Sequence, residues 1–461
     1  MRRLMVLNVV GLTSEMIGPG TPNLLALSQN GFLRPMQTVL PAVTCSVQAS
    51  MLTGRHPQDH GIVGNGWYDR DLSEVMFWKQ SNRLIQSERV YEMARRQAVT
   101  HTTAKMFWWF NMYADVAWSV TPRPSYPADG RKIPDIYSEP ESLRDELQER
   151  LGKFPLFNFW GPTADIKSTA WITDASLDVW KHQRPDLMLV YLPHLDYNLQ
   201  RLGPSNPAIQ QDIAAVDRQA GRLIEEALNS DASVLVVSEY GITETNRPIH
   251  LNRILREQGY LRVRREPLGW ETLDCGASRA FAVADHQVAH VYVRRPSDVA
   301  AIQRMLMNVP GIERVLDRVE QKSFGIAHQR SGDLVVISER DAWFTYYFWQ
   351  DDALAPDYAR TVDIHRKPGY DPVELFIDPE LQWPKVRVLK RLIQKKLGFR
   401  YYMDVIGLNA EIVRGSHGRL PDASRMESDA PVLICSDKSA ERDKLHVCDV
   451  QNLILSLQFR S

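Results

Sequence analysis

Cysteine is scarce in this sequence, and no long apolar segment interrupts it. The 461-residue chain has four cysteines, Cys45, Cys275, Cys435 and Cys448, and none forms a CxxC pair. Their wide spacing predicts reduced, unpaired thiols and argues against a disulfide framework. No stretch reaches the roughly 18–20 apolar residues that a membrane-spanning helix needs, so we expect no membrane span.

A charge bias is also missing. Lys plus Arg total 55 and Asp plus Glu total 56, which gives a net charge of −1. This balance predicts no nucleic-acid partner and no acidic tail. The sequence has no internal repeat and no low-complexity tract. With 44% hydrophobic and 24% charged residues, it has the composition of a globular protein, either one large domain with insertions or a few smaller ones.

The first residues, MRRLMVLNVVGL, allow two interpretations. Two arginines before an apolar run are typical of a signal peptide, but the run is short and no small-residue cleavage site follows it. A first β-strand over Leu4–Val10 is the better interpretation. We therefore expect a cytoplasmic protein.

Apolar strand patterns alternate with helical patterns along the chain. The predicted elements are, in order, a strand at 4–10, helices at 21–30 and 45–53, a strand at 185–193, a helix at 208–230 and a strand at 232–238. Because the strands are apolar on both faces, this alternation predicts an α/β protein with a largely parallel sheet. Functional side chains are then expected beyond the carboxyl ends of the strands.

Two regions depart from this alternation. Residues 70–170 are rich in aromatic residues and proline, with KMFWWFNMY at 105–113, and residues 265–400 contain a further strand pattern at His290–Val293. We interpret both as insertions or caps on a single catalytic domain that spans 1–461. The aromatic run is either ordinary packing or part of a ligand pocket, and the residues alone leave both open.

Thr44 is the candidate nucleophile. Its hydroxyl is predicted at the start of the helix at 45–53, where backbone N–H groups favour an anion such as phosphate. Threonine is a weak nucleophile unless a base or a metal activates it. The alternative is that Thr44 only caps this helix.

Candidate metal ligands are carboxylates and imidazoles that follow strands or lie in loops: Asp196, Glu239, His365 and His417. Such a set suits zinc, and two ions about 4 Å apart would suit in-line phosphoryl transfer. Each of these residues, taken alone, is more often structural, as a solvated loop histidine or a helix-capping acid. His286 in ADHQVAH has the same two interpretations.

Several motifs occur in the order of a known superfamily. They are PAVT ending at Thr44, MLTG at 51–54, PQDHGI at 57–62 with Asn65 beyond it, DYNLQRLGP at 196–204, SEYG at 238–241 and GSHG at 415–418. In these motifs the chain resembles the alkaline phosphatase superfamily, in particular its nucleotide pyrophosphatase/phosphodiesterase branch. The resemblance implies a three-layer α/β/α sandwich around a largely parallel mixed sheet. It also implies Thr44 as nucleophile, Asn65 as a donor to a phosphate oxygen, and Asp196 and His417 as ligands of one ion.

The chain departs from the family pattern at the metal ligands. Val10 stands where the family has an aspartate, and only Asn8 is polar on that strand face. Gln200 replaces a histidine, and Glu239 with Tyr240 replaces an Asp-His pair. We therefore expect one ordinary ion, completed by His365. We expect the second ion to be absent, weakened, or rebuilt from Asn8, Glu239 or His286. Zinc is the expected metal, with manganese or magnesium as alternatives.

The sequence thus predicts a metal-dependent phosphoric ester hydrolase of the phosphodiesterase or nucleotide pyrophosphatase type. Its partner would be a phosphorylated small-molecule substrate. A sulfatase is disfavoured, because that group needs a modified Cys or Ser followed by Pro and Arg, and the segment after Thr44 lacks both. The competing hypothesis is an accessory or binding protein, or an enzyme of altered chemistry, on a phosphatase fold with a degenerate second metal site.

Overall fold

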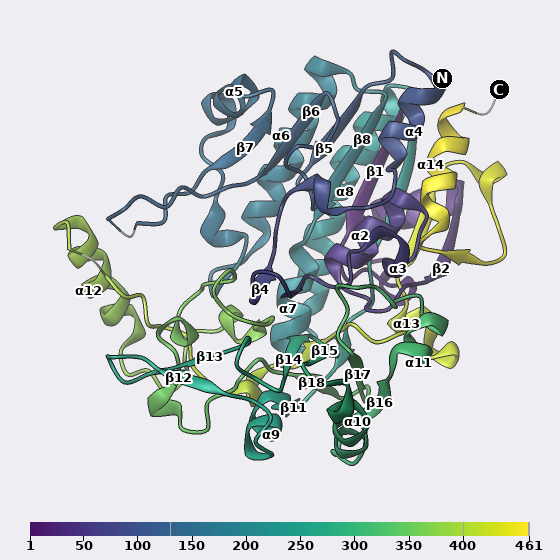
Figure 1. Ribbon diagram of the computed structural model, residues 1–461. Helices are drawn as coiled ribbons and strands as arrows, with labels where there is room; N and C mark the ends of the chain where they lie inside the picture. The colour runs from purple at the N-terminus through teal and green to yellow at the C-terminus, as the bar shows by residue number, and fades with distance from the viewer. Residues whose placement is uncertain (130, 400, 460–461) are drawn as a thin grey trace.

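A nine-stranded mixed sheet forms the centre of the protein (Figure 1). The computed structural model describes residues 1–129, 131–399 and 401–459. The strand order is β21-β2-β20-β9-β1-β8-β5-β6-β7. The bounds are β1 (Leu4–Val9), β2 (Phe32–Gln37), β5 (Thr103–Met106), β6 (Trp118–Pro122), β7 (Ile136–Glu139), β8 (Leu187–Leu192), β9 (Ser233–Val237), β20 (Val432–Cys435) and β21 (Leu445–His446).

The middle of the sheet is parallel, as the apolar strands predicted. β1 pairs in parallel with β8 on one side and with β9 on the other, and β5 pairs in parallel with β8 and β6. β7 and β20 run antiparallel to their neighbours. The predicted α/β fold with a largely parallel mixed sheet is therefore confirmed.

Helices cover both faces of this sheet, because side chains of β1 alternate between two apolar cores. Met5 and Leu7 belong to a core with α1, α6 and α8, whereas Leu4 and Val6 belong to a core with α2, α4 and α14. The bounds are α1 (Pro22–Asn30), α2 (Thr44–Thr53), α4 (Val90–Gln97), α6 (Ile166–Gln183), α8 (Ile209–Asn229) and α14 (Asp449–Phe459).

A smaller antiparallel sheet of order β14-β15-β17-β16 lies beyond one end of the main sheet and has its own apolar core (Figure 1). Its strands are β14 (Ala280–Asp285), β15 (Val288–Val293), β16 (Ile312–Leu316) and β17 (Leu334–Ser338). The short strands of the two-stranded sheets are β3 (Gly66–Asp69), β4 (Glu74–Phe77), β10 (Thr243–Glu244), β11 (Arg247–Ile249), β12 (Val263–Arg265), β13 (Glu271–Leu273), β18 (Ala342–Phe344) and β19 (Gly415–Ser416). The remaining helices are α3 (Pro57–His60), α5 (Ser142–Leu151), α7 (His194–Leu202), α9 (Leu251–Glu257), α10 (Val299–Met307), α11 (Arg318–Ser323), α12 (Pro384–Lys396) and α13 (Met426–Asp429).

The structure corrects the interpretation of residues 70–170 as an insertion. Three strands of this region, β5, β6 and β7, extend the main sheet. They are only four or five residues long and carry few aliphatic residues, so their sequence shows no continuous apolar run. The region 265–400 contains the smaller sheet, and its description as a cap stays a prediction.

All four cysteines are free thiols, as expected. Within the described ranges, no helix is both long enough and apolar enough to span a membrane.

Candidate active site

Thr44 is the first residue of α2 and is almost fully buried, with 4% exposure. The N-cap position of this helix is Val43, whose own side chain forms no capping hydrogen bond. The Thr44 hydroxyl instead lies 3.1 Å from the hydroxyl of Tyr240. Thr44 is therefore not a helix cap, and its oxygen is directed toward side chains that follow strand β9.

The Thr44 hydroxyl opens into a cavity of about 1510 Å³. Asp196, Tyr240 and His286 line the same end of this cavity. Several aromatic side chains form part of its walls: Trp78, Trp109, Tyr126, Phe157, Phe159, Trp160, Tyr197 and Tyr370. A deep, largely apolar cleft with a few convergent polar groups is the usual form of a small-molecule site.

Asp196 lies in the first turn of α7, just beyond β8, as the sequence predicted. Its Oδ1 is 3.3 Å from the Tyr240 hydroxyl and 3.9 Å from Nε2 of His417. Its Oδ2 accepts a 2.9 Å hydrogen bond from Gln200, whose own carbonyl accepts one of 2.9 Å from Tyr370. Burial raises the pKa of Asp196 to about 7, so this carboxyl changes charge near neutral pH.

Glu239 follows β9 and is fully buried. Its Oε1 accepts two hydrogen bonds of 2.6 Å, from the side-chain amides of Asn8 and Gln48. Its Oε2 is buried and has no hydrogen-bond partner among the described residues. Burial raises the pKa of Glu239 to about 8, and the amides and the Thr44 side chain lower it in part. Glu239 is thus a fixed carboxyl with one oxygen left for another group.

Asn65 joins the start of α2 to the smaller sheet. Its Oδ1 accepts a 3.0 Å hydrogen bond from the backbone N–H of Cys45, and its Nδ2 donates a 3.0 Å bond to Asp285. The amide of Cys45 is therefore already satisfied, so the predicted anion site at this helix start has one donor fewer. An Asn side chain has two N–H groups, and Asp285 uses one of them.

The ring of His417 lies between the rings of Tyr240 and His286. The rings of Tyr240 and His417 are 3.5 Å apart and nearly parallel, and His286 lies 3.8 Å from His417. Nδ1 of His417 lies 2.8 Å from the backbone carbonyl of Ala42, so it carries the proton and leaves the lone pair on Nε2. That Nε2 is buried without a partner among the described residues.

These contacts leave room for one metal ion but not for two. Asp196 and His417 offer ligand atoms 3.9 Å apart, and two atoms each 2.0–2.2 Å from one zinc are separated by at most about 4.2 Å. This pair therefore fits one ion. A second ion does not fit, because the amides of Asn8 and Gln48 hold Glu239 and the ring of Tyr240 stands in place of an imidazole.

His365 does not complete the ion as predicted. Its Nδ1 lies 3.4 Å from the carbonyl of Phe77, in the cavity wall. Within the described ranges, no three of the predicted ligands Asp196, Glu239, His365 and His417 bring their ligand atoms within 4.8 Å of one another. The loop at 361–369 has no strand or helix pattern, so the sequence could not place this histidine.

Three residues of the site were not predicted from the sequence: Gln48, Asp285 and Tyr370. Asp285 ends β14 directly before His286, and this Asp-His pair at a hairpin turn was the available signal. Gln48 lies one turn after Thr44 on α2, on the same helix face. No sequence signal marks Tyr370, which reaches the site only through the tertiary fold.

A large mixed sheet with a buried threonine at a helix start, and with carboxylates beyond neighbouring strands, is the architecture of the alkaline phosphatase superfamily. More particularly, the chain belongs to the family of type I phosphodiesterases and nucleotide pyrophosphatases. The sequence model of this family matches residues 4–371. Members of this family generally depend on divalent metal.

Curated relatives match part of the chain. One is an uncharacterized pyrophosphatase/phosphodiesterase of Schizosaccharomyces pombe, 25% identical over 283 residues, which cover 58% of this chain and 50% of that protein. Another is human ectonucleotide pyrophosphatase/phosphodiesterase family member 7, 23% identical over 235 residues, which cover 49% of this chain and 44% of that protein. The matches span about half the length of these relatives or less.

Solved structures match the whole fold. Murine ectonucleotide pyrophosphatase/phosphodiesterase 5, an inactive variant in complex with AMP, has a TM-score of 0.59 at 15% identity. The match covers 99% of this chain and 95% of the murine protein. Phosphonoacetate hydrolase from Sinorhizobium meliloti has a TM-score of 0.63 at 15% identity, covering 99% of this chain and 96% of that one. At this identity the likeness shows the fold.

Proposed function

We propose that the protein hydrolyses a phosphodiester or pyrophosphate bond of a small molecule, with Thr44 as the nucleophile. The observation that carries this proposal is the position of the Thr44 hydroxyl. It is the buried first residue of α2, and it opens into the aromatic cavity between Tyr240 and the carboxylate Glu239. Such a hydroxyl needs a base to become reactive, and the site contains one.

Glu239 is the proposed base. Asn8 and Gln48 hold its Oε1, so Oε2 stays available beside Thr44. A base whose pKa lies near the working pH is efficient, and the pKa of about 8 meets this condition. Thr44 oxygen attacks phosphorus and gives its proton to Glu239 as the ester bond to the leaving group breaks. The leaving group departs as an anion, and the proton on Glu239 passes through solvent to it. Water then attacks phosphorus, the bond between phosphorus and the Thr44 oxygen breaks, and one proton of the water restores the hydroxyl.

Two groups would stabilise the phosphoryl oxygens. Asn65 is fixed by Cys45 and Asp285, so its remaining N–H is held in place as a donor. Asp196 and His417 would hold one divalent ion, for which we propose zinc, and a bound ion supplies positive charge to these oxygens. Tyr240 orients the Thr44 oxygen through their hydrogen bond.

The substrate class follows from the cavity. Its aromatic walls suit a flat or apolar group attached to the phosphate. A nucleotide is one such ligand, and the structural relative murine ectonucleotide pyrophosphatase/phosphodiesterase 5 was solved with AMP.

Turnover of bis(p-nitrophenyl) phosphate with added zinc tests the proposal. We expect Thr44→Ala to lower kcat more than about 100-fold. The matched control is Thr53→Ala, at the last residue of the same helix, and it should retain activity. Wild-type turnover that survives unchanged in Thr44→Ala would refute a threonine nucleophile.

A second candidate function is binding without turnover. It is favoured by the hydroxyl of Tyr240, which contacts both Thr44 and Asp196. These two side chains therefore have a hydrogen-bond partner without any ion. This candidate predicts that AMP or a phosphodiester binds wild-type protein by calorimetry while no zinc, manganese or magnesium concentration yields product. Product formation that depends on Thr44 would exclude it.

A further inference from the structure

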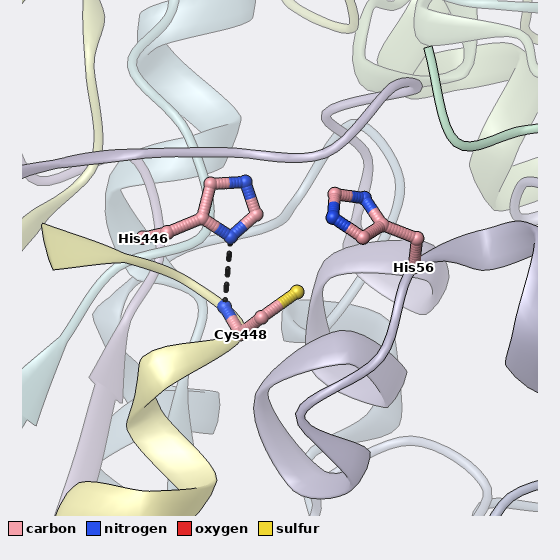
Figure 2. Close-up of side chains that lie close together, drawn as sticks. All are labelled: His56, His446 and Cys448. Carbon is pink, nitrogen blue, oxygen red and sulfur yellow. Dashed lines mark hydrogen bonds between the residues drawn. The ribbon is translucent and has the colours of Figure 1, made fainter. Parts of the chain in front are cut away.

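His56, His446 and Cys448 lie close together (Figure 2), and none of them lines the catalytic cavity. His56 directly precedes α3, His446 ends β21, and Cys448 directly precedes α14. One ligand atom from each lies within 4.8 Å of the other two, and within the described ranges this is the one such group of three. Figure 2 shows the two rings and the thiol around a common space.

The surroundings hold these side chains in orientation. The backbone carbonyl of Thr38 bonds the ring of His446, and Nδ1 of that ring accepts a 3.1 Å hydrogen bond from the backbone N–H of Cys448, which an ion would replace at Nδ1. The ring of His56 packs on Gly325, where an added Cβ would lie 2.7 Å from Nδ1. Backbone carbonyls that fix a histidine ring are typical partners of metal-ligating histidines.

We propose that His56, His446 and Cys448 bind one zinc-like divalent ion. Two imidazoles and a thiolate are a frequent zinc donor set, and in a tetrahedral site such atoms lie roughly 3.3–3.6 Å apart. The three ligand atoms lie within 4.8 Å of one another, so they need to approach one another by no more than about 1.5 Å.

This ion would act as a clamp. It would join the end of the nucleophile helix α2 to the C-terminal helix α14, which already meet where Gln451 donates to the carbonyl of Leu52. The far end of α2, at Thr53, is nine residue steps from Thr44, or about 13.5 Å along the helix. The site is therefore distinct from the one proposed for Asp196 and His417.

Cobalt titration of the metal-stripped full chain tests the clamp. We expect a thiolate-to-cobalt charge-transfer band that saturates at one equivalent, is displaced by zinc, and accompanies a rise in Tm. Cys448→Ser and His56→Asn should lose the band. Cys275→Ser, which removes another partly buried free thiol, and His417→Ala should keep it.

Two results would overturn this site. One is the absence of the band in wild-type protein. The other is zinc binding of equal strength in His417→Ala and in the double variants that add Cys448→Ser or His56→Asn to it, which would mean an adventitious ion only.

A second inference rests on α12, which stands away from the main sheet at the edge of the molecule (Figure 1). Of the 20 large apolar side chains that are exposed in the described part of the chain, nine lie between residues 377 and 402. Four of them are spaced along one face of α12 and its end: Val386, Leu389, Ile393 and Leu397. Trp383, 78% exposed, precedes the helix.

The positive charge of α12 indicates which kind of partner can bind this apolar face. Its sequence, PKVRVLKRLIQKK, has six basic residues and no acidic one. Asp404 pairs with Arg387 and Arg391. The four lysines of the helix form no ion pair within the described ranges. A second copy would bring like charges together, whereas an anionic surface would neutralise them.

We infer that α12 docks on an anionic lipid surface, with its apolar stripe in the interface and its lysines toward the headgroups. A basic amphipathic helix with a flanking tryptophan is the form such contacts take. Val388, Leu392 and Lys395 of the same helix line the catalytic cavity, so docking would bring the cavity mouth to the bilayer.

Vesicle sedimentation tests this docking. We expect full-length protein to bind phosphatidylserine-containing vesicles at least about 10-fold more strongly than pure phosphatidylcholine vesicles, with binding weakened by salt. Leu389→Asp with Ile393→Asp should abolish binding. Leu268→Asp, at another exposed leucine, should not. Absence of wild-type binding, or association of α12 with a second copy or a protein partner in its place, would overturn the inference.

Discussion

Glu239→Gln should change how the stability of the metal-free protein depends on pH. Glu239 is fully buried, and burial raises its pKa from 4.5 to about 8. The folded protein therefore holds this proton more tightly than the unfolded chain does. The resulting stability is fully present below about pH 4.5 and is lost as pH rises through about 8.

The magnitude follows from the shift. A change from 4.5 to about 8 corresponds to about 5 kcal/mol at about 1.4 kcal/mol for each pH unit, of which about 4 kcal/mol falls between pH 5 and pH 9. The Glu239→Gln variant does not titrate. It can still accept from Asn8 and Gln48, but its new N–H group is left without a partner, which costs about 1–3 kcal/mol at every pH.

Urea unfolding in the presence of a chelator measures both effects. The free energy of unfolding of Glu239→Gln minus that of wild type should rise by about 4 kcal/mol from pH 5 to pH 9. Exposed Glu257→Gln serves as the surface control, for which this difference should stay constant. A difference for Glu239→Gln that is equally constant would refute the buried, proton-holding carboxyl.

Further predictions concern activity and packing. The kcat/KM of wild type should rise with pH up to about 8 as the base ionises, and Glu239→Gln should lower it and remove this rise, as a pH–rate profile would show. Gly415→Ala should lower both Tm and activity, because the added Cβ would lie 2.1 Å from the carbonyl of Leu199. This contact lies between the segments that carry Asp196 and His417, and an unchanged Tm and activity would contradict it. Leu189→Ala, at a fully buried position of β8, should cost about 2–5 kcal/mol in urea unfolding without altering the pH profile.

The sequence predicted the framework well because that framework is local. Continuous apolar runs mark β1, β8 and β9 within a residue or two, and helical spacing marks α1, α2 and α8. Burial on both faces requires such runs, so the parallel sheet could be inferred before any contact was known. The short strands β5, β6 and β7 carry no such signal, and their place in the sheet is a tertiary property.

The sequence also singled out part of the candidate site. Residue types and motif order singled out Thr44, Asn65, Asp196, Glu239 and His417, and all of them lie at or beside one end of the cavity.

What only the tertiary structure decided is how these groups are partnered. Sequence spacing does not tell which oxygen of Glu239 the amides of Asn8 and Gln48 occupy, or that Tyr240 bonds Thr44. Sequence spacing also does not tell whether His365 lies close enough to Asp196 to share an ion with it. Hydrogen bonds and metal coordination depend on separations of a few ångströms between segments hundreds of residues apart, and only the packed chain sets those separations.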